Sequence, residues 1–142
     1  MDQTEGNVKQ AVPFFLVTNM DASLRFYVDG LGFQMKNKWM FDGTVRWCLL
    51  ERDAVALMLQ DLRRDHGGVG KLEGKPGLGV SICFICKDAL AFYHEVKARG
   101  VNASKPFVGN GMWVTSLADP DGYHIDFESP TDVAEDTEYN EA

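Results

Sequence analysis

Apolar and polar positions along the chain fall into two similar halves. Each half begins with a short apolar run that is typical of a strand, at residues 11–17 and 79–85. Each run is followed by a stretch with apolar residues three or four positions apart, at 20–33 and 86–101, and this spacing predicts an amphipathic helix. Because both stretches contain a Phe-Tyr pair and have glycine near their ends, we expect one structural unit to be repeated twice.

Three further strand-like runs follow each predicted helix. They span roughly 33–41, 45–52 and 54–60 in the first half, and roughly 101–108, 112–118 and 123–128 in the second half. The last two runs of each half are joined by the sequences ERDA and ADPDG, whose residues suit a tight hairpin turn. Each half is therefore predicted to be a βαβββ module, which places the chain in the α+β class.

Composition sets the remaining boundaries. We expect a polar N-terminal segment at 1–10, module one at about 11–61, a linker at 62–76, module two at about 77–130 and a tail at 131–142. The linker is polar and Gly-rich, so it is either a plain connection or a lid over a site, and its His66 is expected to be a solvated loop residue. The tail carries five of the 21 acidic residues and no Lys or Arg, which predicts a disordered acidic segment.

Charge and hydropathy argue against several classes of function. The net charge is -7 and basic residues are not clustered, so a nucleic-acid partner is not expected. Membrane insertion is not expected either, because no apolar run approaches the roughly 20 residues that a membrane-spanning helix needs. The polar, acidic start does not resemble a signal peptide, and a cytoplasmic location is expected.

Cys83 and Cys86 have the C-x-x-C spacing, but the sequence around them is typical of a strand. Residues three positions apart on a strand point to opposite faces. A redox or zinc C-x-x-C pair needs a turn or the start of a helix. We therefore expect these cysteines to be reduced and to have a packing role.

The run YHIDFE at 123–128 raises the main functional question. Its alternation places His124, Asp126 and Glu128 on one face of a strand, opposite three apolar side chains. A polar strand face is either solvated or part of a cavity. The pattern leaves both alternatives open.

Two motifs, taken with the order of the elements, resemble the vicinal oxygen chelate superfamily. They are FYVDGLGF, after the first strand, and DPDGYHIDF, near the end. This superfamily includes glyoxalase I, extradiol dioxygenases, fosfomycin-resistance proteins and bleomycin-resistance proteins, and the resemblance covers about residues 10–130. The opening QAVPFFLV…SLRFYVDGLGF looks most like the bleomycin-resistance branch. The resemblance implies that each module curls into half of a barrel-like mixed sheet around a cavity.

The resemblance also locates the positions where the metal enzymes of the superfamily carry their ligands. In this chain those positions hold Val12, Met58, Ser81 and Asp126. A hard or borderline cation needs N or O ligands, and of these four side chains only that of Asp126 suits one well. The expected protein is therefore metal-free, without a cofactor, and a divalent metal is the alternative.

A shift of one or two residues in that comparison would offer other ligands. Gln60, His124 and Glu128 would then join Asp126. Same-face neighbours on one strand lie about 6.5–7 Å apart, so three ligands from the last strand do not readily close on one small ion.

The resemblance further implies that the polar face of the last strand looks into the cavity. The expected ligand-binding residues are Phe14, Leu16, Trp39, Trp47, Met58, Ser81, Trp113 and Asp126. Aromatic walls with a carboxylate favour a flat or cationic ligand, through stacking, cation–π contact and charge. Arg46 and Trp47 are adjacent on one strand, so only one of them faces the cavity, and the sequence does not decide which.

Three functions follow from this resemblance. The favoured one is a small-molecule-binding protein that sequesters a drug-like compound. The second is a metal-dependent lyase or dioxygenase. The third is a metal-free enzyme in which Asp126 or His124 acts as general base. The resemblance also implies a homodimer, with a possible exchange of the first strand at Pro13, and the site is either within one chain or between two.

Overall fold

The computed structural model describes residues 6–61 and 74–141. Module one comprises β1 (Phe14–Val17), α1 (Met20–Leu24), the π-helical segment η1 (Arg25–Gly30), β2 (Gln34–Phe41), β3 (Thr44–Arg52) and β4 (Val55–Asp61). Module two comprises β5 (Ser81–Ile85), α2 (Ala89–Ala98), β6 (Phe107–Gly109), β7 (Met112–Ala118) and β8 (His124–Pro130). The predicted α+β class and the duplicated βαβββ order are confirmed. His66 and most of the predicted linker lie outside the described residues.

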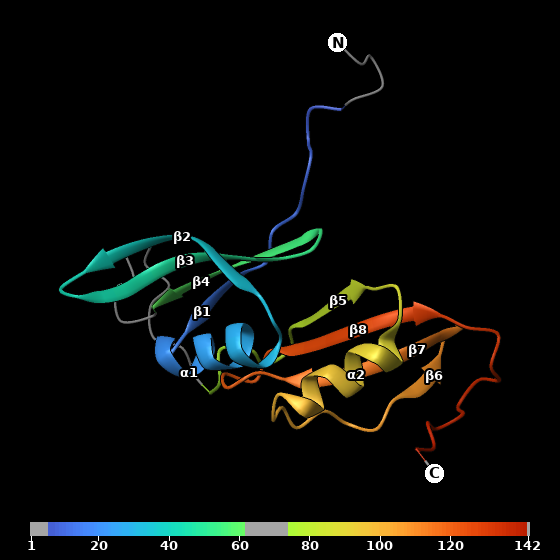
Figure 1. Cartoon of the computed structure of the whole chain (residues 1–142). Coiled ribbons are helices and arrows are strands. Elements are labelled where there is room, and N and C mark those ends of the chain that lie inside the picture. The colour runs from blue at the N-terminus through green and yellow to red at the C-terminus, as the bar shows by residue number, and fades with distance from the viewer. Residues whose placement is uncertain (1–5, 62–73, 142) are drawn as a thin grey trace.

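Each module forms a four-stranded mixed sheet. The strand orders are β1-β4-β3-β2 and β5-β8-β7-β6, so the two sheets have the same topology. The first and last strands of each module run parallel, with Phe14 beside Met58 in one sheet and Cys83 beside Asp126 in the other. Figure 1 shows the two modules next to one another, each with its own helix.

The helices start at side-chain caps and cover one face of each sheet. Asn19 accepts a hydrogen bond from the backbone N–H of Ala22, and Asp88 accepts one from that of Ala91. α1 packs on β4, and α2 packs on β7 and β8. Within the described ranges, no helix combines the length and apolar character needed to cross a membrane.

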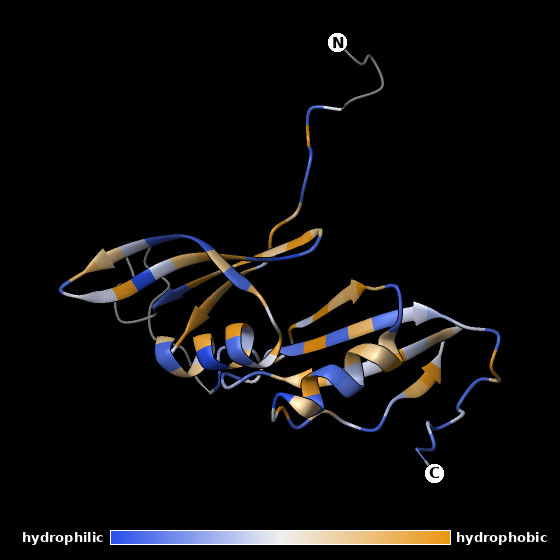
Figure 2. Cartoon of the chain, in the orientation of Figure 1, coloured by the Kyte–Doolittle hydropathy of each residue, from blue (hydrophilic) through white to orange (hydrophobic). Residues whose placement is uncertain are grey.

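The helix-side faces of both sheets share one core. Strand alternation turns Phe15 of β1 and Phe84 of β5 toward it, and both are buried. Phe15 stacks on Tyr123 of module two at 4.0 Å between ring centroids, and Phe33 of module one lies 6.3 Å from Phe84. Figure 2 shows hydrophilic and hydrophobic residues alternating along β8, as a strand with one buried face requires. Each module is therefore covered partly by the other.

The turn between β7 and β8 ties module two to module one. The Asp119 carboxylate accepts hydrogen bonds from the Tyr27 hydroxyl at 2.7 Å and from the backbone N–H of Asp121 and Tyr123, both at 2.9 Å. Asp121 accepts from the backbone N–H of Thr18 at 3.1 Å and from its hydroxyl at 2.5 Å. Both carboxylates are buried. The sequence DPDG thus forms an inter-module anchor as well as the predicted turn.

The start of the chain differs from the expected first strand. β1 begins at Phe14, although an apolar run from residue 11 had predicted an earlier start. Pro13 still contributes its carbonyl oxygen, which accepts a hydrogen bond from Met58 at 2.8 Å, but a proline has no N–H to extend the ladder. Residues 6–9 run away from the body of the molecule (Figure 1).

The acidic tail packs along β6 in the part of it that the structure describes, up to residue 141. Val108 of β6 donates its N–H to the carbonyl of Thr137 and accepts from the N–H of Asp136, each at 2.9 Å. The Tyr139 ring lies 6.0 Å from that of Trp113 and 6.1 Å from that of Tyr93. The tail therefore pairs with the free edge of β6, and composition alone does not predict these hydrogen bonds.

Candidate functional site

The face of the first sheet that points away from its helix is apolar and open. Alternation with the buried residues places six side chains of β1, β3 and β4 on this face: Phe14, Leu16, Trp47, Leu49, Met58 and Gln60. Trp39 of β2 is the register partner of Trp47. Phe14 is 50% exposed and Trp39 is 45% exposed, so aromatic rings lie at the surface. An apolar surface of this kind marks an interaction site more often than a free surface.

The structure decides between Arg46 and Trp47. Arg46 lies on the helix side of β3, where its guanidinium forms a 2.8 Å ion pair with Asp61. Both side chains of this pair are largely buried. Trp47 therefore lies on the open face, next to Gln60 of β4.

The corresponding face of the second sheet is polar. It carries side chains from β5, β7 and β8: Ser81, Cys83, Ser116, His124, Asp126 and Glu128. Ser81 is the register partner of His124, and Cys83 is that of Asp126. The three polar residues of the last strand therefore do share one face, turned away from α2.

Asp126 is the centre of a small hydrogen-bond network on this polar face. Its Oδ1 accepts a hydrogen bond from the Ser116 hydroxyl at 2.6 Å and lies 3.1 Å from Nε2 of His124. The Asp126 side chain is only 18% exposed, whereas that of His124 is 51% exposed. The network holds the carboxylate in one orientation at the sheet surface, with His124 at its solvent-facing end.

The cysteines do not provide a thiolate at neutral pH. Partial burial, followed by the effect of the neighbouring Glu128, raises the pKa of Cys83 to about 12. Burial also raises the pKa of Cys86. Cys83 lies on the open face of β5, whereas Cys86 follows the end of that strand, and both are free thiols. Because a thiolate is the reactive and metal-binding form, neither cysteine is suited to those roles.

The residues at the superfamily's metal positions do not fit a divalent catalytic ion. Val12 and Met58 offer no hard donor, Ser81 offers only a hydroxyl, and Asp126 is the single carboxylate. In residues 6–61 and 74–141, no three His, Cys, Asp or Glu side chains form a group able to hold a metal. Gln60, the further candidate, lies on the other sheet.

A groove of about 550 Å³ lies where the two sheets meet. It is lined by residues 10–13, 54–56 and 81–84, which come from the N-terminal segment, the start of β4 and β5. Val12, which precedes β1, and Ser81 of β5 both line this groove. It also borders Cys83 on the polar face.

Trp113 is placed differently from the other expected ligand-binding residues. It alternates with Met112 and Val114 on β7, and it points to the side where Tyr139 and α2 lie. Trp113 therefore does not share a face with Asp126, and its ring lies beside that of Tyr139 in the tail. Ser116, which the sequence reasoning missed, takes the place opposite Asp126. Placing Ser116 opposite Asp126 requires the pairing register of β7 with β8, and the alternation within one strand does not contain that register.

Comparison with known proteins agrees with this fold. A protein-family model described as the Glyoxalase/Bleomycin resistance protein/Dioxygenase superfamily matches residues 9–127. No curated protein sequence matches the chain. A solved glyoxalase/bleomycin resistance protein/dioxygenase from Nocardioides is 18% identical, with a TM-score of 0.69, covering 96% of this chain and 94% of that one.

Two other solved structures have similar folds. TnmS3, an antibiotic binding protein from Streptomyces sp. CB03234, is 20% identical with a TM-score of 0.66; 89% of this chain and 100% of that chain are covered. A bleomycin resistance determinant encoded on the transposon Tn5 is 21% identical with a TM-score of 0.64, with the same coverage of 89% and 100%. At these identities the likeness shows a common fold.

Proposed function

Because this chain belongs to the glyoxalase/bleomycin resistance protein/dioxygenase superfamily, we propose that it binds and sequesters a small flat or cationic molecule on its open sheet faces, without a metal ion. The observation that carries this proposal is the pairing of an apolar, aromatic face on one sheet with a polar face centred on Asp126 on the other. Ligand sites in proteins are mostly apolar, with a few polar groups that orient the ligand. Trp39 and Trp47 supply rings for stacking, and Asp126 supplies a negative charge.

A second copy of the chain would complete this site. The aromatic face and the Asp126 face belong to different sheets, and each faces away from the shared core. A homodimer would set the aromatic face of one copy against the polar face of the other, and this arrangement would enclose a ligand between them. The extended residues 6–13 would be available for exchange between the copies, with Pro13 at the hinge.

The similar structures support a binding role. TnmS3 is described as an antibiotic binding protein, and the Tn5 protein as a bleomycin resistance determinant. A binding role needs neither a metal nor a nucleophile, which agrees with the donors found at the metal positions. The free cysteines are compatible with the cytoplasmic location that we propose.

General-base catalysis is the second candidate function, and the His124–Asp126 contact favours it. A general base must lie within hydrogen-bond reach of the proton that it abstracts. The Asp126 carboxylate is held in place by the Ser116 hydroxyl and by its contact with His124. Catalysis at this site would convert the bound molecule into a product of different mass or structure, whereas binding alone would leave it unchanged. Incubation with the ligand followed by mass spectrometry separates binding from catalysis.

The proposed function is tested by a thermal-shift screen of planar aromatic compounds that are cationic, neutral or anionic. We expect cationic members to raise the melting temperature most. Tryptophan fluorescence of Trp47→Phe and Trp113→Phe then locates the site. Ligand-induced quenching should be reduced in Trp47→Phe and retained in the matched control Trp113→Phe.

Two further measurements complete this test. Asp126→Asn should weaken binding of a cationic ligand by roughly tenfold, as expected when a partly desolvated charge is lost. Elemental analysis of protein purified without chelator or metal-affinity tag should find less than one divalent ion per dimer. A stoichiometric metal ion, or quenching that depends on Trp113, would overturn the proposal.

A further inference from the structure

The acidic tail pairs with β6 in the way that a neighbouring strand would. Val108 donates its N–H to the carbonyl of Thr137 and accepts from the N–H of Asp136, each at 2.9 Å. Tyr139 donates its N–H to the carbonyl of Pro106, also at 2.9 Å. β6 is the last strand in the order of the second sheet, and β7 lies on its other side. The tail therefore covers the edge at which this sheet ends.

Side-chain contacts add to this backbone pairing. The Glu135 carboxylate accepts hydrogen bonds from the backbone N–H of Asn110 and, at 3.2 Å, from that of Gly111. The Tyr139 hydroxyl lies 2.9 Å from Nε2 of His94 on α2. The ion pairs of the tail join side chains that are at least 45% exposed, so they contribute little to its attachment. The backbone hydrogen bonds and the Tyr139 ring are thus its main attachments.

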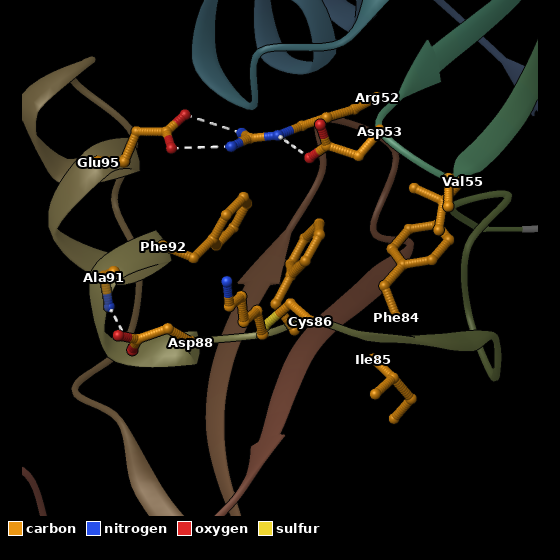
Figure 3. Close-up of a pocket in the computed structure, with 13 residues that line it drawn as sticks. Arg52, Asp53, Val55, Phe84, Ile85, Cys86, Asp88, Ala91, Phe92 and Glu95 are labelled. Carbon is orange, nitrogen blue, oxygen red and sulfur yellow. Dashed lines mark hydrogen bonds and ion pairs between the residues drawn. The ribbon is translucent and has the colours of Figure 1, made fainter.

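The helix behind the tail is fixed from its other side. Glu95 of α2 accepts hydrogen bonds from Arg52 through both carboxylate oxygens, each at 2.8 Å. Figure 3 shows this pair, which joins α2 to the end of β3. The Phe92 ring of α2 also stacks on that of Phe127 of β8, with 3.9 Å between the ring centroids. An opening of the β6 edge would therefore displace the tail and leave α2 in place.

The groups that the tail occupies on this edge are self-complementary. In an antiparallel pair, two opposite residues exchange N–H···O=C bonds, and the next bonded residues lie two positions away on each strand. Val108 has both its N–H and its carbonyl on the outer edge. Pro106 offers a carbonyl and Asn110 an N–H, two positions to either side. The β6 strand of a second copy, related by a two-fold axis at Val108, would meet all of these groups.

We propose that the acidic tail prevents two copies of this chain from pairing through β6. An uncovered strand edge is a template for another strand, and native proteins cover such edges. Without the tail, β6 would present the Val108 backbone together with Phe107, whose side chain is already 41% exposed. The pairing is an edge contact and leaves the open sheet faces free, so it does not depend on the proposed function.

Two substitutions at Asp136 release or retain the tail without changing β6. Asp136 has a φ of 66°, which lies in the left-handed region. Asp136→Pro is incompatible with this conformation, because proline fixes φ at about −65°, and it also lacks the N–H that bonds the Val108 carbonyl. Asp136→Gly removes the same carboxylate but adopts positive φ readily, so it is the matched control.

Hydrogen exchange of the Val108 amide in the full chain reports the state of this edge. In the parent and in Asp136→Gly, its protection should be equal and independent of protein concentration, because Thr137 of the same chain accepts the bond. In Asp136→Pro, protection should be roughly tenfold lower in dilute solution, as for a locally opened segment. It should recover as the protein is concentrated and copies pair.

Sedimentation over the same concentration range measures the association itself. The molar mass of Asp136→Pro should at least double relative to that of Asp136→Gly. The same doubling should occur when Trp39→Glu is added to both variants, since that substitution acts on the open aromatic face. A failure of the two-copy site on the open faces would therefore leave this result unaffected.

Three outcomes would overturn the proposal. In the first, Asp136→Pro keeps the Val108 protection of the parent in dilute solution, which would show that the tail does not cover this edge. In the second, Val108 stays unprotected at every concentration, so the released edge does not pair. In the third, Asp136→Gly associates as strongly as Asp136→Pro, although it retains the backbone pairing of the tail.

Discussion

The hydroxyl of Tyr27 donates a 2.7 Å hydrogen bond to the carboxylate of Asp119, 92 positions away in the chain. Tyr27 is fully buried and Asp119 nearly so. The bond joins the π-helical segment of module one to the hairpin turn of module two. Burial, and then the nearby Asp119 charge, raise the pKa of Tyr27, so its hydroxyl is a donor at neutral pH.

Tyr27→Phe is expected to lower the free energy of unfolding by about 1–3 kcal/mol, because it leaves a buried carboxylate without one of its donors. Urea denaturation followed by circular dichroism measures the difference. Tyr139→Phe is the matched control, since its hydroxyl meets His94 at the exposed surface. Equal losses for the two variants would contradict the anchoring role of Tyr27.

Gly77→Ala is expected to cost more than about 2 kcal/mol of stability, because overpacked backbone atoms have nowhere to move. An added Cβ would overlap the backbone N of Tyr123 and the carbonyl carbon of Gly122. Gly6→Ala is the control, since no atom lies within 4 Å of its added Cβ. Thermal unfolding of both variants measures the effect. A Gly77→Ala protein as stable as Gly6→Ala would show that Gly122 and Tyr123 approach residue 77 less closely.

The Arg52–Glu95 ion pair is expected to make stability depend on acid. Arg52 lowers the pKa of Glu95 below its ordinary value of 4.5, so the folded state favours the charged form. The unfolded chain therefore binds a proton first as the pH falls. The contribution of the pair is complete above about pH 4.5 and is lost as the pH drops through the lower folded-state pKa.

Urea unfolding of Glu95→Gln between pH 3 and pH 7 measures this dependence. The variant should be less stable than the parent at pH 7, and the difference should shrink toward pH 3. Glu51→Gln, on the opposite face of β3, should follow the parent curve. A difference that stays constant across this range would exclude the ion pair as its cause.

The open aromatic face is expected to hold two copies together, as the proposed site requires. Trp39→Glu places a charge on this face and should shift sedimentation from dimer toward monomer, because burying an unpaired charge is costly. Leu78→Glu is the control, since Leu78 is 69% exposed but lies outside both sheets. A parent protein that sediments as a monomer would contradict the proposed two-copy site.

Hydrophobic periodicity was sufficient to predict the two modules and most strand limits, because alternation and helical spacing are local properties. Faces within one strand followed from the same rule, as for His124 and Asp126 on β8. The side of Trp113 and the position of Ser116 depended on how β7 pairs with β8, and a local pattern does not contain that register.

Long-range contacts explain the remaining differences between prediction and structure. Asp61 holds Arg46 on the helix side of β3. Tyr27 and Thr18 hold the DPDG turn, and each lies more than 90 positions from its partner in the turn. The tail contacts the backbone of Val108 and the ring of Trp113, and its charge pattern alone does not predict these contacts. Such partners become visible only when distant segments are brought together.

The shared core has a consequence for how such a duplicated chain arises. A single βαβββ module would expose the helix-side surface that Phe15 and Tyr123 cover here, and it could bury that surface only against a second copy of itself. Fusing two copies replaces an encounter in solution with an intramolecular one, at an effective concentration set by the connecting segment. Once joined, the two halves no longer need to be identical. One half is then free to keep an aromatic face while the other acquires Asp126 and its polar neighbours.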